Sequence, residues 1–130
     1  MKKTNKTTED YLEAILMIKE KKGVVRSVDI AEFFDIKKPS VTYATKMLRE
    51  KGYILMDEQN LITLTDTGFE IAEHILERHR VLTKVFTMLG VDEETAMADA
   101  CRVEHDLSPV TYEALAKHIK QYGQFDPSKK

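Results

Sequence analysis

A short connection between two helical segments constrains the fold of this chain most. Residues 28–34 have the apolar spacing of a short helix, and only residues 35–38 separate them from Pro39. Proline is favoured in the first turn of a helix, so the next helix is predicted over residues 39–51, with Gly52 ending it. Two helices joined by so short a turn are typical of a helix-turn-helix.

The flanking segments extend this motif. A helix over residues 8–22, with Thr7 as its N-cap, precedes the pair, and Ser27 is predicted to cap the short helix. Two short strands with a turn between them follow within residues 53–64, which predicts a β-hairpin. This is the order of a winged helix-turn-helix, in which the second helix of the pair lies in the DNA major groove.

The rest of the chain is predicted to be helical. A long helix begins after Thr65 or Thr67, a second is capped by Asp92 and extends to about residue 106, and a third begins at Ser108-Pro109. The tail over residues 125–130 is expected to fray. Apolar positions on the last two helices suit a dimer interface or an internal core equally. They are Val91, Ala96, Ala100, Val103, Leu107, Leu115 and Ile119.

The predicted fold class is therefore mainly α with one small β-hairpin. We expect a winged helix-turn-helix DNA-binding domain over residues 1–66 and a helical dimerisation and metal-binding domain over residues 67–130. No apolar run approaches the roughly 18 residues that a membrane span needs. The single cysteine excludes an internal disulfide, and a cytoplasmic location is the expectation.

The outward face of the helix over residues 39–51 suits DNA. The helical period buries Val41, Ala44, Met47 and Leu48 and leaves polar side chains outside, where hydroxyls can contact bases or phosphates and lysine a phosphate. The candidate DNA-binding residues are Lys37, Lys38, Pro39, Ser40, Thr42, Tyr43 and Lys46. A three-helix bundle used for protein contacts is the alternative. The hairpin and the lysine-rich flank favour DNA, although the formal net charge is only −2.

A second group of residues has metal-ligand chemistry. Cys101, Glu104 and His105 are spaced three and four apart, which places them on about one face of a helix. A thiolate, a carboxylate and an imidazole form a transition-metal ligand set, and His79 lies on the preceding helix. Taken alone, Cys101 is as readily a small core residue.

The first helix carries a matching pair of carboxylates. Asp10 and Glu13 are three residues apart and share a face. Asp10 by itself could serve only as a favourable charge near the helix N-terminus. Four acidic or thiol groups and two imidazoles in one small helical protein favour a bound cation.

These motifs resemble the diphtheria toxin repressor and manganese transport regulator family over roughly residues 5–122. The similar runs are Thr7 to Glu13, Asp29 to Glu32, Pro39 to Thr42, Arg78 to Arg80 and Ala100 to His105. The resemblance implies a homodimer that binds a palindromic double-stranded DNA operator and represses metal-uptake genes. It also implies six metal ligands, which are Asp10, Glu13, His79, Cys101, Glu104 and His105.

The chain departs from both branches of this family. Asp10 is the manganese-type residue at its position, whereas Cys101 is the iron-type residue at its own. Iron-type members carry a Glu and a His of an ancillary site where this chain has Thr83 and Met97, so that site is expected to be absent. The chain also ends before the third, SH3-like domain of the iron branch. Hard oxygen ligands suit Mn(II) and Fe(II), and the thiolate also admits Co(II) or Zn(II) in vitro.

Two other functions are compatible with parts of this pattern. A winged-helix regulator could use Cys101 as a redox sensor, provided that the thiol is accessible. A helical di-metal enzyme usually presents two Glu-x-x-His motifs on separate helices, and this sequence has no such pair. We therefore predict a regulator and not an enzyme.

Overall fold

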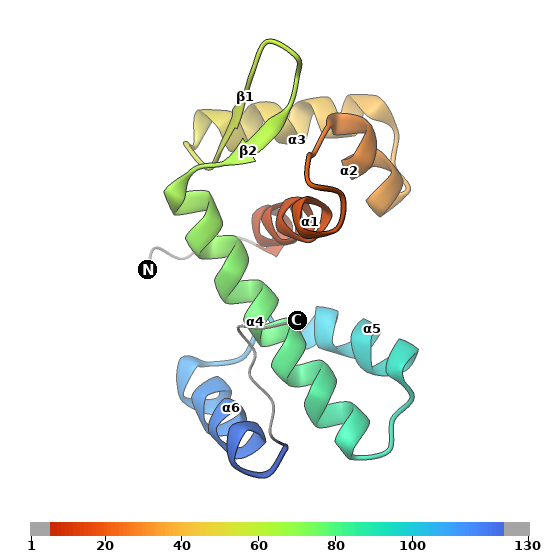
Figure 1. Cartoon of the computed structure of the whole chain (residues 1–130), viewed down its shortest axis with the longest axis vertical. Helices are drawn as coiled ribbons and strands as arrows, with labels where there is room; N and C mark the ends of the chain where they lie inside the picture. Colours follow the sequence, from red (N-terminus) through yellow and green to blue (C-terminus); the bar gives the residue numbers. More distant parts are fainter. Residues whose placement is uncertain (1–5, 124–130) are drawn as a thin grey trace. The chain divides into compact units, whose positions relative to one another are not determined.

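The computed structural model describes residues 6–123 and is mainly helical, as predicted (Figure 1). Its elements are α1 (Lys6–Lys22), α2 (Ser27–Phe34), α3 (Lys38–Glu50), β1 (Ile54–Met56), β2 (Ile62–Leu64), α4 (Asp66–Met88), α5 (Glu93–Val103) and α6 (Pro109–Gly123). The chain divides into two compact units within α4, one ending at Glu73 and the other beginning at His74. The tail predicted to fray lies outside the described residues.

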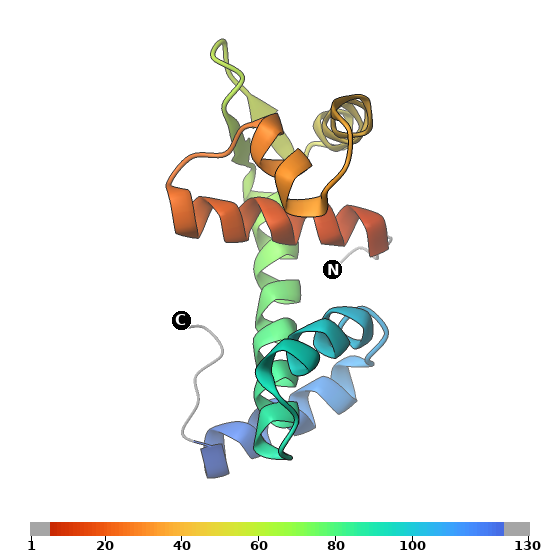
Figure 2. The same cartoon turned by 90° about the vertical axis from the view of Figure 1, so that its right-hand side faces the viewer.

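The first unit has the predicted winged helix-turn-helix order, and Figure 2 shows α1, α2, α3 and the hairpin. The strands are antiparallel, with Ile54 opposite Leu64. The backbone N–H of Ile62 donates to the carbonyl of Val25 at 2.8 Å, which attaches the hairpin to the segment between α1 and α2. Apolar side chains from all of these elements form the core, including Leu12, Ile15, Ile30, Val41, Leu48, Ile54 and Ile62.

Three predicted helix starts are wrong by one or more residues. α2 includes Ser27, and its N-cap is Arg26. The buried carboxylate of Asp29 accepts the backbone N–H of Arg26 at 2.9 Å and a hydrogen bond from Lys22 Nζ at 2.5 Å. The Asp29 side chain is thus the acidic member of a capping box, because it accepts the backbone N–H of the N-cap residue Arg26. α1 also includes Thr7, which is therefore not a cap.

α3 likewise begins earlier than predicted. It starts at Lys38, with Lys37 as its N-cap, so Pro39 lies within the first turn and is not the first residue. Proline is tolerated there because backbone N–H groups of the first turn have no partner within the helix.

The start of α4 is fixed by a close backbone approach. Thr65 is the N-cap, since its hydroxyl accepts the backbone N–H of Gly68 at 3.1 Å and donates to the carbonyl of Gly52 at 2.7 Å. A Cβ at Gly68 would lie 2.0 Å from the carbonyl oxygen of Tyr53, so this position requires glycine. Of the two threonines that the sequence left open, Thr65 is correct.

In the second unit, α5 and α6 flank the C-terminal part of α4 (Figure 1). The predicted cap Asp92 is confirmed, since it accepts the backbone N–H of Thr95 at 3.0 Å. At the predicted start of the last helix, the Ser108 hydroxyl accepts the backbone N–H of Thr111 at 3.2 Å. Three apolar residues that the sequence left open are internal core, namely Ala96, Ala100 and Ile119. Apolar side chains exposed on this unit are Met88, Leu89, Met97 and Val110.

α5 is shorter than predicted, because it ends at Val103 and not at residue 106. Glu104 still has helical backbone angles, but the N–H of Asp106 bonds to the carbonyl of Val103, which tightens the chain into a turn. Within residues 6–123, no helix combines the length and apolarity that crossing a membrane requires.

Candidate metal centre and nucleic-acid interface

The carboxylate of Glu104 is the centre of a cluster in the second unit. Glu104 is fully buried directly after α5. Its Oε2 lies 3.0 Å from His79 Nδ1 on α4, and its Oε1 lies 3.5 Å from His105 Nε2. One carboxylate thus lies between two imidazoles, which are neutral metal ligands when deprotonated.

Cys101 extends this cluster from the last turn of α5. Its thiol and a Glu104 carboxylate oxygen lie within 4.8 Å of one another, and the cysteine is exposed. The prediction that Cys101, Glu104 and His105 share one helix is only partly correct, since α5 ends before Glu104. The turn nevertheless brings a carboxylate, a thiol and imidazoles together, and this donor set fits a divalent transition metal.

The other two predicted ligands lie in the first unit. Asp10 and Glu13 are both on α1, separated by about one helical turn. Glu13 is buried and Asp10 is half-buried. The structure therefore confirms that these carboxylates share a helix, and their role as ligands remains a prediction.

The predicted DNA-binding residues form an exposed surface on α3 and the turn before it. All seven are exposed, from Lys37 to Lys46, and Tyr43 is 68% exposed. The hydroxyl of Thr42 donates to the carbonyl of Lys38 at 3.1 Å, which leaves its oxygen as an acceptor. Val41 and Leu48 are buried beneath this surface, as the helical period predicted, whereas Ala44 and Met47, which were also predicted to be buried, are half-buried.

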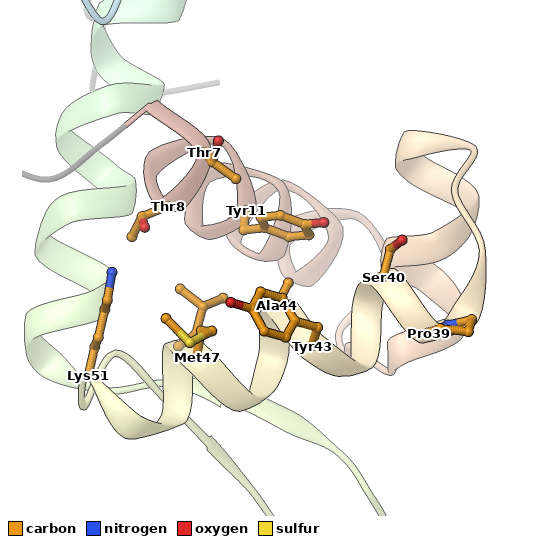
Figure 3. Close-up of a pocket in the computed structure, with 10 residues that line it drawn as sticks. Thr7, Thr8, Tyr11, Pro39, Ser40, Tyr43, Ala44, Met47 and Lys51 are labelled. Carbon is orange, nitrogen blue, oxygen red and sulfur yellow. The ribbon is translucent and has the colours of Figure 1, made fainter.

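A groove of about 580 Å³ separates α3 from α1 in the same unit (Figure 3). Tyr11 of α1 and Tyr43 of α3 lie on opposite walls, and Lys51 lies at one end. Tyr11 also packs against Phe34, with ring centroids 5.0 Å apart, and burial raises the pKa of its phenol. The wall formed by Tyr11 is therefore anchored to α2.

A second groove, of about 550 Å³, lies between α2, α3 and the hairpin. It is lined by the basic residues Arg26, Lys38 and Arg49 and by the amides of Gln59 and Asn60. Arg26 was not among the DNA-binding residues predicted from the sequence, because it precedes a helix whose burial pattern does not indicate a contact with DNA. The sequence could have placed Lys38 and Arg49 on the same basic surface, since residues 38, 42, 45 and 49 share one face of α3.

Together these features define a class of protein. A winged helix-turn-helix with a basic α3 surface is typical of proteins that bind duplex DNA. A helical unit with clustered carboxylate, thiol and imidazole groups is built to bind a divalent metal. The combination is that of a metal-responsive, DNA-binding transcriptional regulator.

Comparison with known families supports the same class. Residues 3–60 match the iron dependent repressor, N-terminal DNA binding domain. Residues 65–130 match the iron dependent repressor, metal binding and dimerisation domain. The two matches follow one another along almost the whole chain.

Individual relatives align with nearly the whole chain. An HTH-type transcriptional regulator of Methanocaldococcus jannaschii is 37% identical over 121 residues, which span 91% of this chain and 96% of the relative. The HTH-type transcriptional regulator MntR of Bacillus subtilis is 32% identical over 127 residues, which span 98% of this chain and 89% of the relative.

Solved structures show the same fold. The manganese regulator SloR superposes with a TM-score of 0.74 at 27% identity, over 87% of this chain and 53% of SloR. IdeR of T. acidophilum gives a TM-score of 0.75 at 22% identity, over 95% of this chain and 56% of IdeR. The chain thus spans about half the length of these two proteins.

The chain belongs to the iron-dependent repressor family, which contains the diphtheria toxin repressor and MntR-type regulators. Both matched domains are those of iron-dependent repressors, and the MntR relative is a transcriptional regulator. The chain is therefore a metal-dependent transcriptional regulator and not an enzyme. Divalent metal, DNA and a second copy of the chain are the partners that the family's two domains specify.

Proposed function

We propose that this protein represses metal-uptake genes by binding a palindromic operator when Mn(II) or Fe(II) is plentiful. The observation that carries the proposal is the buried Glu104 carboxylate between His79 and His105, in a chain with an exposed basic α3 surface. SloR, which shares this fold, is described as a manganese regulator. The proposed domains are residues 1–66 for DNA and residues 67–130 for metal and dimerisation.

The proposed ligands are the six residues of the sequence pattern: Asp10, Glu13, His79, Cys101, Glu104 and His105. Three of them, His79, Cys101 and His105, gather around the carboxylate of Glu104 in the second unit, and the other two share a face of α1. The bound ion supplies the positive charge that lets these anionic groups approach one another. Metal binding by both units would then select the arrangement that binds DNA, and by linkage DNA would tighten metal binding.

The metal is selected by opposing ligand preferences. The carboxylates of Asp10, Glu13 and Glu104 are hard ligands that suit Mn(II) and Fe(II). The thiol of Cys101 is softer and strengthens binding of Fe(II), Co(II) and Zn(II). We propose Mn(II) or Fe(II) as the sensed ion, with Co(II) or Zn(II) binding in vitro.

On DNA, the exposed residues of α3 divide by chemistry. We propose that Lys37, Lys38 and Lys46 contact phosphates, and that Ser40, Thr42 and Tyr43 face base edges beside Pro39. Arg26 and Arg49, which line the second groove, add phosphate contacts beside the hairpin. Two recognition helices of a dimer would occupy half-sites roughly 34 Å apart.

A selection from random DNA tests this function. The protein is incubated anaerobically with a random-sequence duplex pool, first with chelator and then with Mn(II), Fe(II), Co(II) or Zn(II). We expect enrichment of a palindrome only with metal. Enrichment that is equal in chelator would refute metal dependence, and no enrichment under any metal would refute operator binding.

The exposure of Cys101 also favours a second candidate, a redox-sensing regulator. Such a regulator would bind its operator without metal and lose that binding when peroxide oxidises the thiol. In this case metal-free wild type would bind the operator and lose that binding in peroxide, whereas Cys101→Ser would still bind in peroxide. That result would replace the metal-sensing proposal with this one.

A further inference from the structure

Arg78 is a buried cation one residue before the proposed ligand His79. The residue is 5% exposed on α4. Its Nη1 donates to the carbonyl of Glu104 at 3.1 Å and to that of Leu107 at 2.6 Å. Its guanidinium carbon lies 5.0 Å from the centre of the Tyr112 ring on α6. All of these groups belong to the second unit, so one side chain joins α4, α6 and the turn after α5.

The two hydrogen bonds of Arg78 are made to the turn that carries two proposed ligands. Glu104 and His105 lie where α5 has ended, and the carbonyls at such a helix end lack partners within the helix. Arg78 provides donors to two carbonyls three residues apart. A guanidinium holds its N–H groups in a rigid plane, so it fixes the direction of both carbonyls at once.

Neighbouring residues of α4 therefore hold Glu104 at two points. Arg78 binds its backbone carbonyl, and the His79 ring lies 3.0 Å from its carboxylate. With the carbonyl fixed, the side chain of Glu104 leaves the backbone in a defined direction toward His79 and His105. Groups that orient metal ligands from outside the ligand set commonly control metal affinity.

We propose that Arg78 is a positioning residue of the metal centre, which shapes the turn of residues 104–107 into its ligand-presenting form before metal binds. This inference rests on the proposed function, in which Glu104 and His105 are ligands. A fixed positive charge near a cation site opposes cation binding by Coulomb repulsion. Arg78 therefore assists the metal through geometry and not through charge.

Three variants test the role of Arg78. Arg78→Met keeps a long side chain but removes both donors, and Arg78→Lys restores donors without the planar guanidinium. Ile119→Ala is the matched control, because it truncates a buried side chain of α6 in the same unit. The probes are Mn(II), titrated by calorimetry below the unfolding temperature, and Co(II), whose absorption spectrum reports the ligand geometry.

We expect Arg78→Met to weaken Mn(II) binding about 10- to 100-fold and to alter the Co(II) spectrum. Arg78→Lys should recover part of this loss. Ile119→Ala should lower the unfolding temperature while keeping the wild-type Mn(II) Kd and Co(II) spectrum. Folded Arg78→Met with wild-type affinity and spectrum would overturn the positioning role and leave only a structural one.

A measurement on the wild-type chain keeps the inference testable if Arg78→Met does not fold. Amide hydrogen exchange in chelator should show the N–H groups of Glu104 and Asp106, which donate to the carbonyls of Ala100 and Val103, already protected, and added Mn(II) should change their protection little. Exchange at unprotected rates until metal is added would overturn the inference, since metal and not Arg78 would then shape the turn. Wild-type protein that binds no metal at all would instead refute the proposed function.

Discussion

Cys101 is the residue at which ligand chemistry most directly predicts metal preference. It is the only soft donor among the six proposed ligands, and it is exposed at the end of α5. We predict that Cys101→Glu weakens binding of Co(II) and Zn(II) by about tenfold or more while Mn(II) binding is retained, because an oxygen donor suits the harder ion. Anaerobic competition titrations with a metal-binding dye measure these affinities.

The control for this prediction is Arg102→Glu, which adds negative charge at the exposed neighbouring position. If the order of the metals changes equally in both variants, charge and not the thiol determines the preference. Unchanged Co(II) and Zn(II) affinity in Cys101→Glu would remove Cys101 from the ligand set.

Asp29 gives the first unit a predictable pH dependence. The hydrogen bond from Lys22 lowers the pKa of this carboxyl below its ordinary value of 3.8, and the backbone N–H of Arg26 adds to the effect. A lowered pKa in the folded state means that the ionised group stabilises the fold above the unfolded pKa, and that this contribution is lost as the pH falls through the folded pKa.

We predict that Asp29→Asn costs about 1 kcal/mol of unfolding free energy at neutral pH, which is the usual cost of losing a helix-terminal hydrogen bond. The variant should also lose less stability than wild type as the pH falls below about 4. Urea unfolding from pH 7 to pH 2.5 measures both effects, with Glu32→Gln on the exposed face of α2 as the control. Parallel pH profiles for Asp29→Asn and wild type would refute the assignment.

Single residues differed in how far the sequence could predict their roles. The outward positions of α3 followed from the helical period alone, because each depends only on its near neighbours in the chain. The role of Arg78 could not be foreseen, since it depends on carbonyls 26 and 29 residues further along the chain. From the sequence alone, an arginine in an amphipathic helix is predicted to lie at the surface, because its buried partners are not known.

At the scale of elements, α3 and the turn before it carry the proposed contacts to DNA. Lys46 lies on the exposed face, where a lysine can neutralise one phosphate. We predict that Lys46→Ala weakens binding to all duplex sequences alike and reduces the magnitude of the salt slope by about one. Fluorescence anisotropy on operator and scrambled duplexes from 50 to 200 mM salt, about the range in which this effect is large, measures both quantities.

Lys21→Ala provides the matched control, because Lys21 is exposed at the end of α1, away from α3 along the chain. It should leave the slope unchanged. A loss confined to the operator would instead indicate that Lys46 reads a base, and an unchanged slope would remove it from the interface.

The order of the elements was predictable, whereas several of their ends were not. Apolar periodicity and turn residues specified six helices and one hairpin. The ends depend on particular partners: Asp29 moves the start of α2 to Ser27, and the turn held by Arg78 follows Val103 at the end of α5. The error at α5 matters most, because the prediction placed Glu104 and His105 on a helical face, whereas the structure places them in a turn.

At the scale of the whole molecule, the proposed function requires communication between two compact units. α4 runs through both, and the proposed ligands are divided between α1 in the first unit and α4, α5 and the following turn in the second. The sequence itself suggested candidate ligands on the first helix and on the later helices, but only the family resemblance named all six as metal ligands. Helical periodicity does not reveal which residues of separate helices bind metal together.

The proposed division of metal ligands between the two units predicts how strongly metal binding and DNA binding are coupled. If one ion must be held by both units for tight DNA binding, removing a ligand from α1 should uncouple the two binding events while the donors around Glu104 still bind metal. Asp10→Ala removes such a ligand from the first unit. Exposed Glu9→Ala, if it retains coupling, excludes a general effect of charge at the start of α1.

The measurement that tests the account most directly is the Mn(II) affinity of wild type and Asp10→Ala, each with and without operator DNA. We predict that operator tightens Mn(II) binding by wild type roughly 5- to 150-fold, that Mn(II) tightens operator binding by the same factor, and that both factors fall close to one in Asp10→Ala. Equal coupling in wild type and Asp10→Ala would contradict the proposal that ligands from both units hold the ion that controls DNA binding.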